Sequence, residues 1–175
     1  MEGYEADDVL GTLSSRASMS GFQTMILTSD LDLLQLVSPI TEVEVFSQYW
    51  PKRAFDVEAA KRRFGGLAPE NIPDYKALAG DTSDNLPGVP GIGAVAATAV
   101  LGEYGNLDEV YEDLEAIPKL PIRGARRVSR LLAEHREQAF LMRTLTTIVC
   151  DVPVDVDIDG AMIKESGLGT VEAMA

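Results

Sequence analysis

Seven carboxylates of this chain are gathered in three short groups, and together they could hold divalent cations. The groups are Glu5, Asp7 and Asp8, then Asp30 and Asp32, and finally Asp81 and Asp84. Each group lies at the boundary of an expected helix or strand. Carboxylates that lie this close repel one another, which raises their pKa values and destabilises the fold unless cations are bound. Because Mg²⁺ prefers oxygen ligands and keeps several waters, the three groups predict a shared metal site without His or Cys.

The last acidic group opens a loop, residues 80–93, that is rich in glycine and proline. Asp81 and Asp84 are three residues apart, so on a helical or turn-like backbone they share a face and could aim at one cation. Gly88, Gly91 and Gly93 leave the backbone free to adopt positive φ and to approach a ligand through its N–H groups. Taken alone, the same composition is ordinary turn chemistry, so a purely structural loop is the alternative.

The chain offers little for nucleophilic or zinc chemistry. Its single cysteine, Cys150, follows Thr147-Ile148-Val149 and is interpreted as a small buried apolar residue. Its single histidine, His135, lies among charged residues on an expected helix surface. A catalytic triad or a zinc site is therefore disfavoured.

The formal net charge of −13 hides a basic segment between residues 119 and 143. That segment has a local charge of +5, which leaves −18 for the remainder of the chain. Its arginines include Arg123, Arg126, Arg127 and Arg130 on one expected helix. A basic stripe on an acidic protein is usually a solvated face, but phosphate binding is favoured when a glycine-rich loop accompanies it.

The elements that must position these groups alternate between helix and strand in the first half of the chain. Apolar spacing predicts a helix over 6–19, a strand over 24–28, a short helix over 31–36 and a strand over 42–46. Further helices are expected over 57–64, after the N-cap Asp56, and over 73–79. Asp30 and Asp32 then follow the carboxyl end of a strand, where open α/β sheets place their ligands.

Beyond Gly93 the pattern becomes helical. Helices are expected over 94–104, 107–114, 122–133 and 135–145, a returning strand over 146–149, and an acidic, weakly structured tail over 151–175. We therefore expect an α/β unit over 1–79, a helical unit over 80–145 and a terminal segment over 146–175.

Composition places the chain among globular proteins. Its 175 residues with 46% hydrophobic content suffice for one domain or two small ones. No apolar run approaches the ~20 residues of a membrane span, and the first residues lack the features of a signal peptide. A cytoplasmic location is expected.

Three motifs, taken together, carry a resemblance to a known family. They are Gly3-Tyr4-Glu5-Ala6-Asp7-Asp8, then Leu27-Thr28-Ser29-Asp30-Leu31-Asp32, then Gly80-Asp81-Thr82-Ser83-Asp84-Asn85-Leu86-Pro87-Gly88-Val89-Pro90-Gly91-Ile92-Gly93. In this order and spacing, over residues 3–153, they closely resemble the 5′-3′ exonuclease domain of bacterial DNA polymerase I, within the wider flap endonuclease family. The resemblance implies a nuclease of DNA replication and repair.

The resemblance also implies a fold and a site. The fold would be a PIN-like, Rossmann-like α/β nuclease core followed by a mainly α helix-three-turn-helix region that grips duplex DNA, such as a 5′ flap or a nicked duplex. Two Mg²⁺ ions, for which Mn²⁺ can substitute, would lie between the carboxylates. Glu5 and Asp7 resemble ligands of the first cation, and Asp30, Asp32 and Asp84 resemble ligands of the second. Asp8 and Asp81 match acids typical of the bacterial branch, which act from behind the direct ligands or through waters.

The DNA contacts implied by the resemblance fall on the glycine-rich hairpin and the arginine helix. The residues concerned are Gly88, Val89, Gly91, Ile92, Gly93, Arg123, Arg126, Arg127 and Arg130. A K⁺ ion at the hairpin, bridging carbonyls to phosphate, belongs to the same expectation.

Two departures from the family pattern stand out. About a hundred residues that precede the first motif in the family, with further aspartates and basic residues, have no counterpart here. We therefore expect the C-terminal part of the nuclease core only, an exposed sheet edge, weak hydrolysis by this chain alone, and a polymerase domain or an N-terminal segment as partner. The second departure is Ala94-Val95-Ala96-Ala97, where relatives carry an acidic and a basic residue.

Two other functions compete with a nuclease. The chain could be a non-catalytic module that holds duplex DNA through the hairpin and the arginine helix. It could also be a haloacid-dehalogenase-like phosphatase, since Asp30-Leu31-Asp32 and the 80–85 segment mimic that family's acidic motifs. The phosphatase hypothesis, however, gives no reason for the glycine-rich hairpin and finds Leu34 where a Thr or Val is expected.

Overall fold

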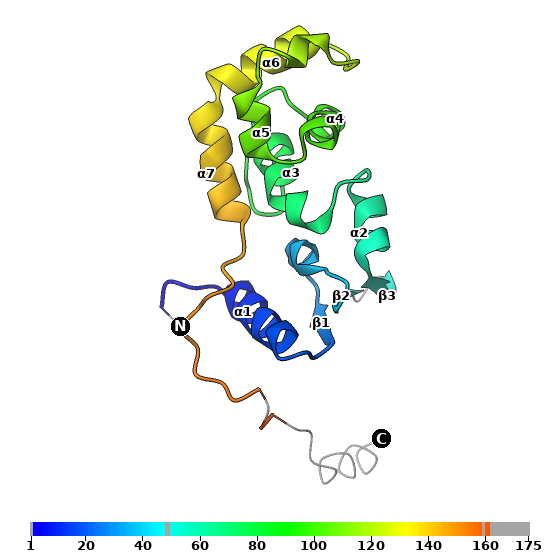
Figure 1. Cartoon of the computed structure of the whole chain (residues 1–175), viewed down its shortest axis with the longest axis vertical. Helices are drawn as coiled ribbons and strands as arrows, with labels where there is room; N and C mark the ends of the chain where they lie inside the picture. The colour runs from blue at the N-terminus through cyan, green and yellow to red at the C-terminus, as the bar shows by residue number, and fades with distance from the viewer. Residues whose placement is uncertain (1, 48–49, 159, 162–175) are drawn as a thin grey trace.

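The computed structural model describes residues 2–47, 50–158 and 160–161, and it shows a small sheet joined to a group of helices (Figure 1). The strands, in the order β1-β2-β3, are β1 (Thr24–Thr28), β2 (Thr41–Ser47) and β3 (Trp50–Phe55). β1 and β2 are parallel, with Thr24 opposite Thr41, whereas β2 and β3 are antiparallel, with Val43 opposite Phe55. Among the described residues β1 pairs with β2 alone, so its outer edge carries no strand.

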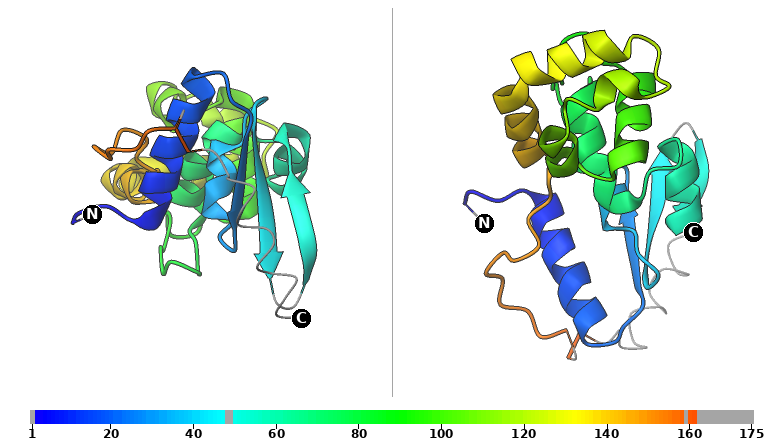
Figure 2. Two further views of the ribbon diagram at one scale, coloured as in Figure 1. Left: turned by 90° about the horizontal axis from the view of Figure 1, so that it is seen from below. Right: turned by 45° about the horizontal axis from the view of Figure 1, so that its top comes forward.

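Helix α1 (Ala6–Met19) lies beside β1, as both views of Figure 2 show. A capping box begins this helix, because the side chain of Asp8 accepts the N–H of Glu5 at 2.9 Å while Glu5 caps the Asp8 backbone in return. Arg16 donates to the carbonyls of Val154 and Val152 at 2.6 and 3.1 Å. These bonds hold the segment that follows the last helix against α1.

Short elements lead from the sheet to the helices. They are the 3₁₀ helix η1 (Asp32–Leu36), the helix α2 (Val57–Arg63) and the 3₁₀ helix η2 (Pro69–Asn71). Asp56 caps α2 as expected, since its side chain accepts the N–H of Ala59 at 2.7 Å.

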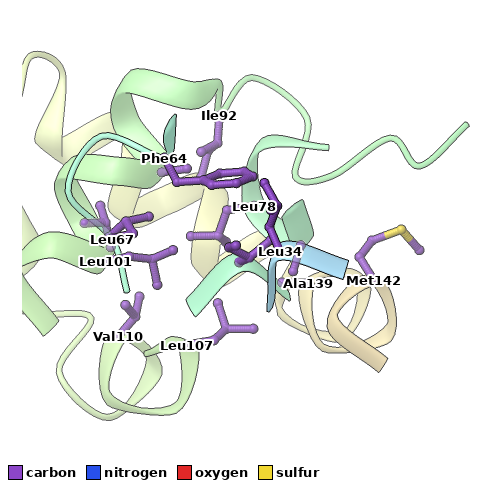
Figure 3. Packing of buried hydrophobic residues seen from close by; sticks show 14 of the residues in the cluster. Leu34, Phe64, Leu67, Leu78, Ile92, Leu101, Leu107, Val110, Ala139 and Met142 are labelled. Atoms are coloured by element: carbon purple, nitrogen blue, oxygen red, sulfur yellow. The ribbon is translucent and has the colours of Figure 1, made fainter. Parts of the chain in front are cut away.

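The helical part is built around α3 (Ile72–Ala79), which packs mainly against the later helices α4 and α7. The remaining elements are α4 (Ala94–Tyr104), α5 (Leu107–Glu112), η3 (Ile117–Lys119), α6 (Ala125–Glu134) and α7 (Arg136–Thr146). Figure 3 shows Leu78 of α3 among Leu34, Leu101 and Met142, which belong to η1, α4 and α7. One core therefore joins the sheet side and the helical side of the molecule.

The expected α/β half followed by a helical half is confirmed, and the helix over 94–104 has the predicted bounds. The returning strand over 146–149 is wrong: Thr146 ends α7, and the following residues run beside α1 without strand pairing. There the hydroxyl of Thr12 donates to the Val149 carbonyl at 3.4 Å and accepts the Val152 N–H at 3.0 Å. Gln35 of η1 also donates to the Thr146 carbonyl and accepts the Ile148 N–H, both at 3.0 Å. Side chains of α1 and η1 thus bond the backbone that was expected to pair as a strand.

Strand β3 was not expected from the sequence, although it forms one of the two outer strands of the sheet. Most of the expected acidic tail, residues 162–175, lies outside the described residues. No helix in the described ranges is long and apolar enough to cross a membrane. The division of the chain after residue 79 stays a prediction.

Candidate metal centre and nucleic-acid interface

Asp32, Asp81 and Asp84 meet at one point of the structure. One carboxylate oxygen from each lies within 4.8 Å of the others. Asp32 comes from the start of η1, whereas Asp81 and Asp84 come from the loop after α3. Asp32 and Asp81 line a cleft of about 600 Å³ that also contains Asp30. Three carboxylates beside an open cleft form a donor set that suits a hard divalent cation.

Local backbone geometry aims the first of these carboxylates. After β1 ends, the hydroxyl of Thr28 accepts the N–H of Asp30 at 3.0 Å. The carboxylate of Asp30 in turn accepts the N–H of Asp32 at 2.9 Å, which is an Asx turn. This turn starts η1 and leaves the side chain of Asp32 at the cleft.

The loop that carries Asp81 and Asp84 is closed by its own hydrogen bonds. Asp81 and Leu86 exchange backbone bonds of 2.9 and 2.7 Å, and Asp81 also accepts the N–H of Ser83 at 2.9 Å. The loop begins at Gly80 and ends near Gly88, and both have positive φ. A Cβ on Gly88 would collide with the backbone nitrogen of Gly80, so the two backbones touch. Only glycine fits at Gly88.

Lys76 is the residue of this site that the sequence analysis missed. Its ammonium forms ion pairs with Asp32, with Asp81 at 2.5 Å and with Asp84 at 4.0 Å. Only 5% of its side chain is exposed. The available signal was a lone lysine among the apolar residues of α3, one turn before the helix ends.

Burial and these contacts act against each other, and they shift the pKa values of Asp32 and Asp81 in opposite directions. Burial raises the pKa of Asp32 to about 6, and repulsion by Asp30 and Asp84 adds to this against the opposing effect of Lys76. Burial would also raise the pKa of Asp81, but hydrogen bonds from Lys76 and Ser83 hold it below the usual range. Burial and the contacts to Asp32 and Asp81 oppose each other at Lys76, whose pKa is raised.

The other predicted acidic residues lie around this trio rather than in it. Burial raises the pKa of Asp7, followed by repulsion from Asp30, Glu5, Asp8 and Asp84, so the three acidic groups share one electrostatic neighbourhood. Asp8 has a structural task, because its two oxygens accept the N–H groups of Glu5 and Val149 at 2.9 and 2.8 Å. In the described part of the chain, the trio is the one group that meets the geometry of a shared cation.

The glycine-rich hairpin is anchored from inside and open outside. Val89 donates its N–H to Leu78 at 2.9 Å, and Ile92 donates to Val89 at 3.0 Å, so these two groups are used within the fold. Gln138 of α7 donates to the Gly88 carbonyl at 2.6 Å. Gly91 and Gly93 are exposed, and within the described residues their N–H groups donate no hydrogen bond. Of the predicted hairpin donors, these two remain accessible.

The arginine helix is α6 in the structure, and it lies against this hairpin. Arg123 was expected on this helix but precedes its first residue, Ala125. A Cβ on Gly91 would lie 3.0 Å from a terminal nitrogen of Arg127, so the guanidinium is adjacent to the glycine backbone. Arg123, Arg126 and Arg127 are exposed, and Arg130 pairs with Glu134 at 3.5 Å. Exposed N–H groups next to a guanidinium are suited to hold a phosphate.

Two family models and several known proteins match this chain. The family model for the 5′-3′ exonuclease N-terminal resolvase-like domain matches residues 1–65, and that for the 5′-3′ exonuclease C-terminal SAM fold matches residues 67–167. DNA polymerase I of Chloroflexus aurantiacus is 44% identical over 93% of this chain and 17% of its own length. A 5′-3′ exonuclease of Buchnera aphidicola is 34% identical over 93% of this chain and 56% of its own length.

Solved structures share the fold. The T5 5′-exonuclease with bound zinc ions superimposes with a TM-score of 0.69 at 23% identity, over 85% of this chain and 52% of that chain. The catalytic core of Rad2 in complex with DNA gives 0.53 at 18% identity, over 87% and 51%. The chain thus spans about half the length of the exonuclease relatives, and less than a fifth of the DNA polymerase I relatives.

We expect the free energy of unfolding to fall as the pH rises from about 4 to 7, and Asp32→Asn to flatten this dependence. The pKa of Asp32 is about 6 in the folded protein against an ordinary value of 3.8, so between these values the folded protein binds the additional proton. The stabilisation is complete below the lower value and is lost as the pH rises through the upper one, by on the order of 1–3 kcal/mol.

Urea unfolding of both proteins in EDTA, from pH 4.5 to 7.5, measures this difference. Asp7 and Asp74 also have raised pKa values, so only the contrast between the two proteins isolates Asp32. If the free energies of unfolding of the two proteins change with pH in parallel, the raised pKa is assigned wrongly to Asp32.

Proposed function

The chain belongs to the 5′-3′ exonuclease family, and from this we propose that it takes part in the metal-dependent hydrolysis of DNA phosphodiester bonds, as a 5′-3′ exonuclease or flap endonuclease. The observation that carries the proposal is the meeting of Asp32, Asp81 and Asp84, of which the first two line one cleft, beside a hairpin with free N–H groups. Mg²⁺ is the proposed ion because every candidate ligand is an oxygen.

In this proposal Asp30, Asp32 and Asp84 hold one cation, with Asp81 beside them, and Glu5 and Asp7 contribute to a second. Two divalent cations, when bound, would activate a water and relieve charge on the attacking and leaving oxygens. The electrostatic proximity of Asp7 to Asp30 and Asp84 supports a common site. Asp8 would act indirectly, by holding the first turn of α1 in place.

The hairpin and the arginine helix would hold the DNA backbone, in a 5′ flap or a nicked duplex. Gly91 and Gly93 present N–H groups, and Arg127 presents its guanidinium beside them. Phosphate contacts of this kind carry no base information, so binding would be insensitive to sequence. A K⁺ ion at the hairpin stays a prediction.

A second candidate is a module that binds duplex DNA without cleaving it. It is favoured by one observation: in the described ranges, Glu5, Asp7 and Asp30 stand outside the group that can share a cation. A mechanism with two cations requires both at once. The phosphatase hypothesis receives no support, because the two exonuclease family models span both of its acidic motifs.

Asp84→Ala is expected to reduce Mg²⁺-dependent cleavage of a 5′-flap substrate at least a hundredfold, because it removes a cation ligand while leaving the hairpin intact. Cleavage is compared for this chain alone and for the chain joined to the part of the Buchnera exonuclease that it does not match. We expect the joined protein to cleave faster.

The non-catalytic candidate predicts duplex binding with no Asp84-dependent cleavage by either protein. If both proteins cleave and Asp84→Ala leaves the rate unchanged, the carboxylate site is assigned wrongly. A matched control is Glu58→Ala on α2, whose carboxylate pairs with Lys61 on the surface.

Replacing Arg127 or Arg126 by alanine is expected to lower the slope of log K against log salt for duplex binding by about 0.9 for each phosphate contact that the substitution removes. Fluorescence anisotropy in EDTA measures binding without cleavage. Lys61→Ala, which removes a paired surface cation, is the control. A slope that does not change in either arginine variant would make this helix a solvated face.

A further inference from the structure

Lys76 occupies the place that a bound cation would need. Among the residues that the structure describes, it is the one basic side chain that is buried. Its ammonium contacts Asp32, Asp81 and Asp84, the same three carboxylates that can share a cation. The protein therefore carries its own positive charge inside its candidate metal site.

The ammonium and a divalent cation would compete for the same oxygens. Lys76 donates to Oδ1 of Asp32 and lies 2.5 Å from Oδ2 of Asp81. A divalent cation binds carboxylates at roughly 2.0–2.6 Å and so requires the same lone pairs. Two positive charges this close also repel each other strongly in a partly buried site.

The ammonium of Lys76 lies beside an open cleft into which it could move. Lys76 lines the cleft of about 600 Å³, on a long and flexible stem. Asp84, whose side chain is 46% exposed, lies 4.0 Å from the ammonium on the open side of the trio. A rotation of the stem can bring the ammonium out along this side.

We propose that Lys76 is an internal counter-ion, which holds the three carboxylates together in the cation-free protein and must withdraw when a divalent cation binds. Lys76 is thus a positioning residue that lowers the affinity of the site. The inference rests on the proposed function only in taking the trio as a cation site, and its test involves no DNA.

Lys76→Met, which keeps the length of the side chain and removes its charge, is expected to have two opposite effects. Without cations the melting temperature should fall, because three carboxylates lose their partner. The affinity for Mn²⁺ should rise at least about tenfold, because the competitor is gone. Paramagnetic resonance of free Mn²⁺ at pH 7.5 measures the affinity, and calorimetry measures the melting temperature with and without Mn²⁺.

Three further variants complete the test. Lys76→Arg keeps the charge and should bind Mn²⁺ as weakly as the unaltered protein. Lys76→Gln replaces Lys76→Met if the latter does not fold, and should also bind more tightly. Asp84→Asn should weaken binding in every background.

Equal or weaker Mn²⁺ binding by the neutral variants would overturn the proposal, since Lys76 would then support the ligands instead of competing with them. Absence of binding by all variants would overturn it too. If only the cleavage of flap DNA fails, the proposed function is contradicted. The difference in Mn²⁺ affinity between the neutral and the charged variants would still support the role of Lys76.

A second observation, independent of Lys76, concerns a cleft of about 590 Å³ that is lined by residues of β3 and α2. Both elements are labelled in Figure 1. Its lining contains Arg53, Arg62 and Arg63, together with Phe55 and two alanines, but no carboxylate. Within the described part of the chain, none of the three arginines forms an ion pair. This is unexpected in a protein with 28 acidic and 15 basic residues.

Two of these guanidinium groups lie near aromatic rings. Arg53 lies 6.0 Å from the ring centre of Phe55, and Arg63 lies 5.7 Å from that of Phe64. Arg63 also lines the cleft of the carboxylate trio, so the two clefts meet at this residue. All three arginines are exposed, and unpaired guanidinium groups are suited to phosphate oxygens.

From this cleft we infer a second contact with the DNA backbone, next to the metal centre and separate from the hairpin. It rests on the proposed function, in that the ligand is the substrate strand. The double variant Arg53→Ala, Arg62→Ala is expected to lower the salt slope for 5′-flap DNA by about 1.8 in EDTA, because it removes two phosphate contacts.

Lys61→Ala on the same helix is the matched control, since Lys61 already pairs with Glu58. An unchanged slope in the double variant, together with a lowered slope in the Arg127 variant, would overturn this inference alone. Absence of DNA binding by the unaltered chain would overturn both this inference and the proposed hairpin contact.

Discussion

Three carboxylates that lie within 4.8 Å of one another require a positive charge between them, and this requirement ties the molecule together. Asp32 follows the first strand of the sheet, whereas Asp81 and Asp84 follow α3. The ammonium of Lys76 on α3 contacts Asp32 beside the sheet and Asp81 after α3, so it links the sheet to the helices at the edge of the cleft. Apolar packing of Leu78 between neighbouring helices fixes α3 from the other side. The position of α3 is thus set both by packing and by charge.

Much of the fold could be predicted because its signals are local. Apolar spacing and caps such as Asp56 are visible within a few residues of sequence, and they located most helices. Strand β3 was missed because its sequence, Trp50-Pro51-Lys52-Arg53, lacks the alternation of a half-buried strand. The strand expected after Thr146 was wrong because pairing is a long-range property. Hydrogen bonds with the side chains of Asp8, Thr12 and Gln35, more than a hundred residues away, satisfy that backbone instead.

The grouping of the acidic residues was predicted from the sequence, but the contacts that each of them makes were not. The spacing of Asp81 and Asp84 and the position of Asp32 after a strand were sufficient to bring them together in the prediction. Sequence could not show that Asp8 would cap a helix with one oxygen and hold Val149 with the other. Nor could the sequence show that Lys76 is buried among the carboxylates. A lysine on a short helix is ordinarily exposed, and the burial of this one depends on the packing of the whole domain.

The contact between Gly80 and Gly88 makes the acidic loop and the hairpin one mechanical unit. Their backbones touch, so the segment between them is a closed ring whose two ends cannot move independently. The carbonyl of Leu78, two residues before this ring, accepts the N–H of Val89, directly after it. A displacement of the hairpin would therefore reach the carboxylates through the backbone itself. If the hairpin holds DNA as proposed, binding of the strand and alignment of the carboxylates would be a single movement.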